Sequence, residues 1–355
     1  MLTIARCLAV AITMAMPMLP QDLPIRPLRP QASFSEPYSW VRGVAELPDG
    51  RVFVADQREL AVYLADLNSR TKLGGNGTGP KEYRAPVGIF TMRGDTAWIH
   101  DLLNRRLVAI TPAGVVAPIT RDAAAGEIIP AAVDTLGRLY WDNNTTIRLK
   151  KREDPSAETG AIVRYTNAHI DTVAAIKVTG PVNPGPFSTY DRWAIALDGR
   201  IAIVRNQDDY RVEWVDARGT VTNGARVNEQ RIRVTNDDQS LYAQKLARRE
   251  VRGGGQAQVG GTQPVRPPAV NYPDQFPYAQ KVLVSPNGQA WVHRFRHIKD
   301  EEPLYDVFDA RGHRIARVAL PARREVIGFG RRWLYAVRID DDGLQWLERY
   351  ALPAS

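Results

Sequence analysis

The sequence predicts an all-β fold, a six-bladed β-propeller whose blades are four-stranded antiparallel sheets. One observation is a polar turn with glycine, followed by a five-residue apolar run, which recurs six times: at 48–50, 93–95, 134–137, 197–199, 286–288 and 328–330. A second is the spacing, because the turn glycines at 50, 94 and 137 are 44 and 43 positions apart, and those at 288 and 330 are 42 apart. A period of about 40–45 residues is typical of propeller blades, since one four-stranded sheet cannot bury both faces alone.

Within each repeat, runs of β-branched, aromatic and aliphatic residues alternate with breaks rich in Gly, Asp, Asn and Pro. The first repeat predicts strands at 43–47, 51–55, 60–64 and 71–73. The second predicts strands at 87–91, 96–100, 106–110 and 115–119. Connections of two to four residues are too short for a parallel crossover, so the strands of a blade are antiparallel.

The last repeat offers only three strands, at 325–329, 333–338 and 344–350. The segment 32–36 precedes the first blade and has no partner in it. We expect this segment to supply the outer strand of the sixth blade, which would remove an exposed sheet edge and tie the two ends of the chain together.

Two insertions interrupt the repeat. The segment 145–159 is polar and charged and lengthens the third blade. The segment 228–280 lies between blades four and five; Thr235 to Asp238 resembles a capping box that predicts a short helix, and a stretch rich in Gly, Gln and Pro follows from Gly253 to Pro268. Such a long loop is either functional, as a lid or a partner contact, or a flexible excursion.

The first twenty residues predict a secretory signal peptide, with Arg6 before a short apolar run from Cys7 to Met18. An uncleaved N-terminal anchor is the alternative. We expect a flexible segment at 21–31, the propeller domain at 32–355, and a periplasmic or secreted protein with no transmembrane span in the mature chain. Cys7 is the only cysteine, so the mature chain would have neither disulfides nor a cysteine nucleophile.

The bulk composition is that of an ordinary globular protein of 355 residues, with 44% hydrophobic and 24% charged residues. The net charge of +8 could attract acidic partners. Because no run of basic residues and no nucleic-acid-binding motif accompanies that charge, the sequence predicts no nucleic acid partner. We expect a monomer.

One linker carries a family resemblance. The stretch GGNGTGPKEYRAP at 74–86 resembles the linker between blades of NHL-type six-bladed propellers, and the strands at 52–56 and 139–143 resemble strands of NHL-repeat and YWTD propellers. The resemblance is closest to secreted bacterial members. It implies a binding or scaffolding role, with enzymes such as lactonases and an amidating lyase as a minority. Only one linker keeps the glycine pattern, and the later blades replace the strand-ending Asp.

The residues that end the second strand of each repeat divide the ring into two halves: Asp56, Asp101, Asn143, Arg205, Arg294 and Arg338. Three guanidinium groups in one sector would suit a carboxylate, sulfate or phosphate. The candidate ligand-binding residues are therefore Arg205, Arg294 and Arg338, with His100 and His293 one position before the strand end. The alternative is that these arginines brace neighbouring blades. If the ligand interpretation holds, Arg294→Ala weakens anion binding by about 1–3 kcal/mol.

The acidic half of the rim suggests a metal site. Asp56, Asp101, Asp142 and Asn143 carry the oxygen ligands that Ca²⁺ or another divalent cation prefers. The alternative is that strand-ending Asp residues bind backbone amides of the adjacent loop. Asp208 with Asp209, and Asp340 to Asp342, are further oxygen-rich stretches that also make turns. No other cofactor is predicted.

Two classes of function remain. The first is an extracytoplasmic propeller that binds a protein, peptide, glycan or small anionic ligand on one face of the ring. The second is a divalent-metal-dependent hydrolase or lyase of the lactonase-like type, which would need acidic and amide side chains from several blades to converge.

Overall fold

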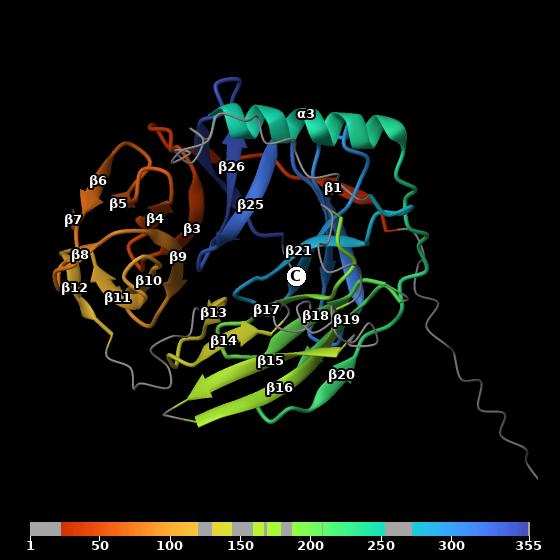
Figure 1. Ribbon diagram of the computed structural model, residues 1–355, viewed down its shortest axis with the longest axis horizontal. Coiled ribbons are helices and arrows are strands. Elements are labelled where there is room, and N and C mark those ends of the chain that lie inside the picture. The colour runs from red at the N-terminus through yellow and green to blue at the C-terminus, as the bar shows by residue number, and fades with distance from the viewer. Residues whose placement is uncertain are drawn as a thin grey trace, which may run out of the picture.

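Six antiparallel blades form a ring in the computed structural model, as the sequence predicts (Figure 1). The structure describes residues 23–353 except 120–129, 144–158, 167–168, 179–186, 208 and 253–271. The predicted signal peptide and most of the insertion at 145–159 lie outside the described residues. No helix in the described part of the chain is long and apolar enough to cross a membrane.

Each of the first three blades consists of four consecutive strands, which are hydrogen-bonded to one another in chain order. Blade 1 is β3 (Val41–Glu46), β4 (Val52–Asp56), β5 (Ala61–Ala65) and β6 (Arg70–Leu73). Blade 2 is β9 (Pro86–Thr91), β10 (Ala97–Asp101), β11 (Arg106–Thr111) and β12 (Gly114–Pro118). Blade 3 is β13 (Ala132–Val133), β14 (Leu139–Asp142), β15 (Thr159–Thr166) and β16 (His169–Lys177).

The last three blades complete the ring. Blade 4 is β17 (Arg192–Ile195), β18 (Ile201–Arg205), β19 (Arg211–Val215) and β20 (Val221–Asn223). Blade 5 is β21 (Ala279–Val284), β22 (Ala290–Arg294), β23 (Leu304–Phe308) and β24 (Arg314–Ala319). Blade 6 is β25 (Arg324–Phe329), β26 (Trp333–Ile339) and β27 (Gln345–Ala351), with β2 (Ala32–Ser33) as its outer strand.

The apolar runs that follow the turns become strands buried on both faces. In β4, Val52 and Val54 pack toward blade 6, while Phe53 and Ala55 pack toward blade 2. Successive side chains of a strand point to opposite faces, so an unbroken apolar run feeds two interfaces. Six apolar clusters of this kind occupy the six interfaces between successive blades, including the interface of blade 6 with blade 1 that closes the ring.

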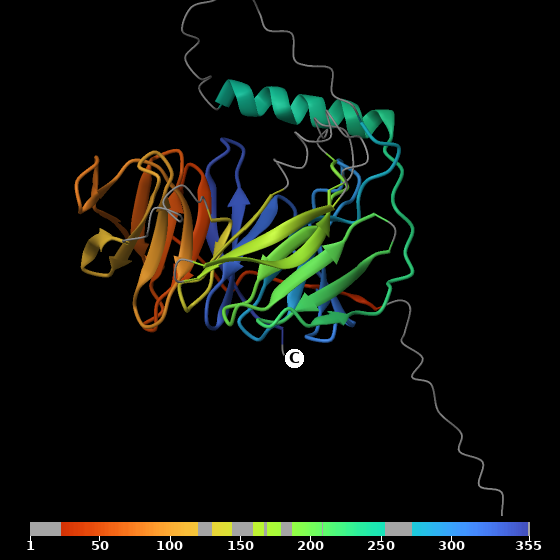
Figure 2. The same cartoon turned by 60° about the horizontal axis from the view of Figure 1, so that its bottom comes forward.

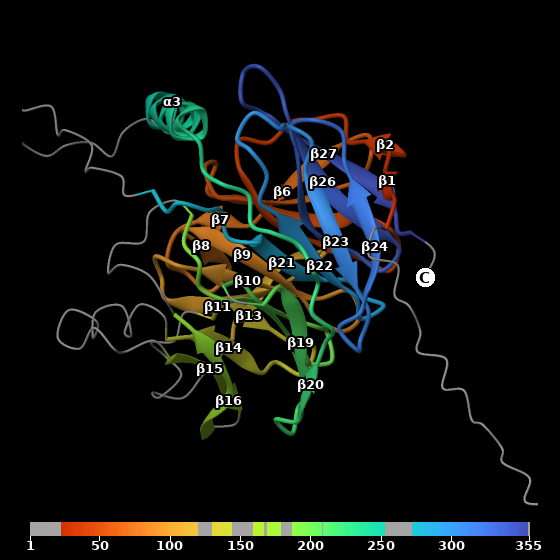
Figure 3. The same ribbon diagram turned by 90° about the vertical axis from the view of Figure 1, so that its right-hand side faces the viewer.

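The N-terminal arm closes the ring as predicted and also does more. β2 pairs antiparallel with β27, with Ala32 opposite Arg349. The structure differs from the expectation of a flexible segment at 21–31, because β1 (Ile25–Pro27) pairs parallel with β24 at the outer edge of blade 5. β1 and β2 lie beside β24 and β27 in Figure 3, so one arm ties two neighbouring blades together.

The turn glycines serve two purposes. Five of the six recurring turns hold their glycine at positive φ, for example 90° at Gly50 and 75° at Gly288, where side chains are strongly disfavoured. The sixth differs: a Cβ on Gly330 would meet the carboxylate of Glu46 at 1.9 Å. Glycine is needed there because blade 1 approaches the turn closely.

The linker that carries the family resemblance is a small structured unit between blades 1 and 2. β7 (Gly75–Asn76) pairs parallel with β8 (Glu82–Tyr83). The Glu82 carboxylate accepts the N–H of Gly79 at 2.8 Å, and a Cβ on Gly77 would overlap that carboxylate. Arg106 donates to the carbonyls of Gly79 and Glu82, both at 2.8 Å. The motif therefore encodes a fixed inter-blade linker.

Candidate functional site

One face of the ring carries the loops between second and third strands and the connections between blades, because the strands alternate in direction. The predicted helix is present as α3 (Asn236–Arg252), and it lies above this face (Figure 2). Its N-terminus has the predicted capping box. Thr235 and Asp238 bond reciprocally, with the Thr235 hydroxyl 2.7 Å from the carboxylate and the Asp238 N–H 3.2 Å from that hydroxyl.

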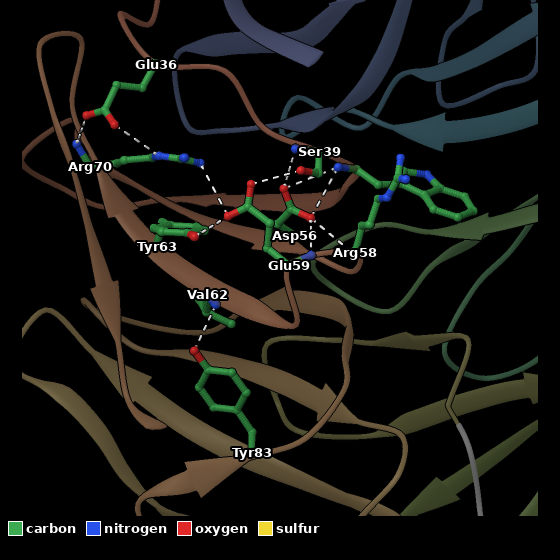
Figure 4. A network of polar contacts seen from close by, with 10 residues as sticks. Glu36, Ser39, Asp56, Arg58, Glu59, Val62, Tyr63, Arg70 and Tyr83 are labelled. Carbon is green, nitrogen blue, oxygen red and sulfur yellow. Dashed lines mark hydrogen bonds and ion pairs between the residues drawn. The ribbon is translucent and has the colours of Figure 1, made fainter. Parts of the chain in front are cut away.

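In blade 1 the strand-ending carboxylate holds its own loops. Asp56 is fully buried and accepts four backbone N–H groups, which come from Ser39 (2.7 Å), Trp40 (3.2 Å), Arg58 (3.0 Å) and Glu59 (3.0 Å). Figure 4 shows this carboxylate among its loop residues. A carboxylate saturated in this way fixes the entry of the chain into the blade.

The other carboxylates and amide expected to bind a metal are also engaged. Asp101 accepts the N–H of Arg84 at 2.9 Å and the Asn104 amide at 2.6 Å. Asp142 accepts the indole N–H of Trp193 at 2.8 Å, and Asn143 Oδ1 accepts the N–H of Ala161 at 2.7 Å; among the residues that the structure describes, no three His, Cys, Asp or Glu side chains are grouped to hold a metal ion. For Asp56 and Asp101 the geometry agrees with the loop-holding alternative, while Asp142 and Asn143 bond to Trp193 of blade 4 and to Ala161 of the next strand.

The three strand-ending arginines are each paired within their own blade. The acidic partner lies on the third strand of the blade, two positions after the residue opposite the arginine. The pairs are Arg205 with Glu213 (2.5 Å), Arg294 with Asp306 (2.5 Å) and Arg338 with Glu348 (3.4 Å). The three guanidinium groups therefore do not form an uncompensated cluster that needs an anion. The repeat places diagonal cross-strand ion pairs, which brace the blade.

Arg294 lies at the centre of a buried charge network between blades 4 and 5. It contacts Asp306 and Glu229 (2.7 Å), donates to the carbonyl of Tyr278 (3.0 Å), and its guanidinium lies 4.3 Å from the ring centroid of Tyr210. Burial alone would raise the pKa of Glu229, but Arg294 and Arg314 lower it to about 2. The network anchors the start of the insertion to blade 5.

Both candidate histidines lie in the second strands of their blades. His100 is buried in β10 between Gly88 and Leu107. His293 stacks on Tyr305 with ring centroids 4.7 Å apart, and burial, helped by Lys281, lowers its pKa to about 4. His293 is therefore neutral at neutral pH, so this placement gives no support to anion binding through it.

The oxygen-rich stretches act as turns where they are described. Asp340 accepts the N–H of Leu344 and the indole N–H of Trp346, each at 2.8 Å. Asp209 is paired with Arg211 (2.8 Å) and Arg226 (3.1 Å). Asp208 lies outside the described residues.

The insertion is fastened to the ring by an aromatic cluster that the repeat pattern gave no sign of. Phe187 is at its centre and packs against four other rings at centroid distances of 4.6–5.8 Å: Tyr242, Tyr272, Phe276 and Phe295. Ile232, Val234 and Ile298 complete the cluster. We call residues 231–252 and 272–276, which this cluster fastens, the cap.

A second contact fixes the end of α3 over blade 5. The Asp238 carboxylate accepts the N–H of Ile298 at 2.7 Å and lies 2.9 Å from Nδ1 of His297. Burial opposes ionisation of Asp238, but the bonds from Thr235 and His297 lower its pKa to about 2. The carboxylate is thus charged at all ordinary pH values, and it joins the helix N-terminus to the loop after β22.

A cleft of about 570 Å³ opens beside the cap, between the connection of blades 3 and 4 and that of blades 4 and 5. We call it the cap cleft; its lining residues are Thr189, Arg231, Arg233, Pro273, Asp274 and Gln275. Arg231 is half-buried and Arg233 is exposed, and neither has an acidic side chain within 4.0 Å in the described part of the chain. The two guanidinium groups are therefore available to a ligand.

A second cavity, of about 450 Å³, lies on the opposite face, and its arginines already have acidic partners. Its lining includes Arg138 and Arg164, with Thr166, His169, Asp171 and Ala217. Arg138 is paired with Asp134 and Arg164 with Asp171, each at 2.5 Å. Both arginines are already committed to the protein, so the cap cleft is the better candidate for an anionic ligand.

Phe187→Ala is expected to loosen the cap while the ring remains folded. The substitution removes four aromatic contacts, and truncation of a buried Phe costs about 3–5 kcal/mol. Hydrogen exchange of the α3 amides should accelerate, while exchange in β4 and β10 should stay slow. Leu136→Ala, an exposed turn residue on the opposite face, is the control. Unchanged protection of α3 would show that the cluster does not fasten the cap.

Comparisons with known proteins identify no family for this chain. No protein-family model matches the chain, and no curated protein matches it. Among solved structures, it is similar to the PQQ-bound aldose sugar dehydrogenase from Streptomyces coelicolor (17% identity, TM-score 0.43, 94% of this chain and 99% of that one). It is also similar to a gluconolactonase from Xanthomonas campestris (10%, 0.44, 92% and 96%) and to virginiamycin B lyase from Staphylococcus aureus (10%, 0.39, 92% and 89%). Identities this low assign no activity to this chain.

Proposed function

We propose that this propeller is a binding protein that holds an anionic ligand in the cap cleft. One observation carries the proposal: Arg231 and Arg233 line a cleft of ligand size, about 570 Å³, without an acidic partner among the described residues. Guanidinium groups present paired donors to two oxygens of a carboxylate or phosphate. The hydroxyl of Thr189 and the amide of Gln275 add neutral hydrogen-bonding groups to the same lining.

The alternative, a metal-dependent hydrolase, is less well supported by the side chains. Asp56 and Asp101 already accept several hydrogen bonds from their own loops, so binding a cation would require these loops to be released. The lining of the cap cleft has a single carboxylate, that of Asp274. Carboxylate-poor linings suit an anionic ligand better than a divalent cation.

Titration with inorganic phosphate and succinate at constant ionic strength tests the proposal. The Arg231→Ala/Arg233→Ala double variant is expected to bind at least tenfold more weakly than the unaltered chain, since loss of a charge-assisted contact costs about 1.5–3 kcal/mol. Arg218→Ala/Arg311→Ala is the matched control, because it removes the same charge from exposed turns on the opposite face. Equal affinity in all three proteins, or no binding to any of them, would refute the proposal.

We also propose that the protein is exported, in keeping with the apolar leader and with the resemblance to secreted NHL-type propellers. The mature protein, expressed in a Gram-negative host, is expected in the periplasm or medium without Met1, and N-terminal sequencing would locate the cleavage near residue 20. An intact N-terminus in the membrane fraction would favour an anchor. Recovery in the cytosol would contradict both.

A further inference from the structure

The floor of the cap cleft is a short two-stranded ladder. The N–H of Phe276 bonds to the carbonyl of Ile232, and the N–H of Val234 bonds to the carbonyl of Asp274, both at 2.9 Å. Arg233 lies opposite Gln275 in this antiparallel pair. Residues 232–234 are therefore held in extended conformation by residues 274–276, and Arg231 directly precedes them.

This ladder has an open edge. Because the residues on either side of Arg233 exchange the ladder bonds, the N–H and C=O groups of Arg233 itself point away from residues 274–276. Arg231 lies two residues earlier and lines the same cleft, so we infer the same direction for its backbone groups. Within the described part of the chain, none of these four backbone groups makes a hydrogen bond. They present a donor–acceptor pattern that a further strand could complete.

The side chains of the segment alternate between protein and cleft. Ile232 and Val234 pack in the aromatic cluster, while Arg231 and Arg233 line the cleft. Residues i and i+2 of an extended chain are about 7 Å apart and point to the same face. An added strand would place its own alternate side chains opposite the two arginines at the same spacing.

We propose that the edge formed by Arg231 and Arg233 takes up an extended peptide with acidic residues at alternate positions, which adds to the ladder as a third strand. The proposal rests on the anion-binding function of the cap cleft and names its ligand class. A peptide fits better than an acidic glycan or a nucleic acid because its backbone satisfies the four open groups while its carboxylates meet the guanidinium groups. The net charge of +8 favours approach of an acidic segment.

Asp274 allows a test in which a substitution is expected to strengthen peptide binding. Its carboxylate is exposed and belongs to the same lining, so it opposes an acidic ligand. Asp274→Asn keeps the carbonyl that accepts the N–H of Val234 and removes the negative charge. The variant is expected to bind the peptide several-fold more tightly, a gain that disruption of the fold would not produce.

The experiment compares fluorescent eight-residue peptides of alternating Glu and Thr by polarisation against the full-length protein. N-methylation of alternate backbone amides keeps the charge and removes donors from one edge of the peptide. Methylation of the amides on the edge that faces the ladder is expected to weaken binding at least tenfold. Methylation of the other alternate set, on the opposite edge, is expected to leave binding unchanged. Arg231→Ala/Arg233→Ala should lose peptide binding, and Arg218→Ala/Arg311→Ala should keep it.

Four outcomes would overturn the proposal. Equal binding of both N-methylated peptides would mean that charge alone is recognised. Tighter binding of polyglucuronate or of a single-stranded DNA oligonucleotide than of the peptide would assign the edge to another polymer. Binding of succinate or phosphate at the cleft without any preference for the alternating peptide would leave anion binding standing and remove strand addition. If neither small anions nor peptides bind, both proposals fail.

Discussion

A chain that begins at Tyr38 is expected to unfold with a free energy about 3–6 kcal/mol below that of the full-length protein, measured by denaturant titration. The estimate combines burial of Phe34, about 2 kcal/mol, with several backbone bonds of about 1 kcal/mol each. Phe34 is 4% exposed, and its N–H bonds to Leu347 at 2.8 Å. The loss is large against the 5–15 kcal/mol that is typical of folded proteins.

Two shorter deletions separate the contributions of the arm. A chain that begins at residue 23 keeps every contact described for β1 and β2 and is the matched control. A chain that begins at Pro30 loses β1, the bond from Leu28 to Ala319, and the packing of the Leu28 side chain against the apolar cluster between blades 5 and 6. We expect this second deletion to cost about 1–2 kcal/mol, because β1 is exposed and supplies a few ladder bonds. If the chain from Tyr38 were as stable as the chain from residue 23, the arm would not close the ring.

The ring was predictable because its determinants are local. Turn chemistry at positions such as Gly50 and Gly288, and apolar runs such as Val52 to Ala55, specify strand ends and strands buried on both faces without reference to distant residues. The closing strand at 32–33 could be inferred because the last repeat was one strand short. The capping box at Thr235 was likewise visible in the sequence.

The features that were not predicted depend on pairings between distant residues. β1 is only three residues long and includes Pro27, so neither alternation nor propensity marks it as a strand. The acidic partners Glu213, Asp306 and Glu348 follow their arginines at three different separations along the sequence, because the loops between second and third strands differ in length. An acidic residue near the start of each third strand was the available signal.

The cap cleft shows the same limit for the site. Arg231 and Arg233 carry no motif, and they become a site only because residues 274–276, some forty positions later, hold them in an extended segment beside Thr189. The strand-ending arginines, which the repeat made prominent, pair within their blades instead. Recurrence of arginine at equivalent positions of blades 4, 5 and 6 thus indicated a structural role within each of these blades.

Arg294→Ala is expected to destabilise the protein by about 3–5 kcal/mol, as found when one partner of a buried ion network is removed. The Arg294 side chain is 7% exposed, and its loss leaves Asp306, which is fully buried, with longer ionic contacts to Arg314 (3.5 Å) and Arg317 (3.4 Å). The hydroxyl of Tyr210 still donates to this carboxylate at 2.8 Å, but it carries no compensating charge. Arg338→Ala is the matched control from the same position of blade 6. Its side chain is 34% exposed and lies 3.4 Å from Glu348, so we expect a cost of at most about 1 kcal/mol.

The pH dependence of the difference distinguishes loss of this network from a general packing defect. The pKa of Glu229 is lowered from 4.5 to about 2 in the folded protein, so the stability gained from its ionised form is present above pH 4.5 and is lost as the pH falls toward 2. Arg294 contributes to that lowering, so the gap in unfolding free energy between the unaltered protein and Arg294→Ala should narrow over this range. A gap that stays constant down to pH 2.5 would assign the cost to packing. A variant of unaltered stability that binds phosphate more weakly would instead restore Arg294 as a ligand residue.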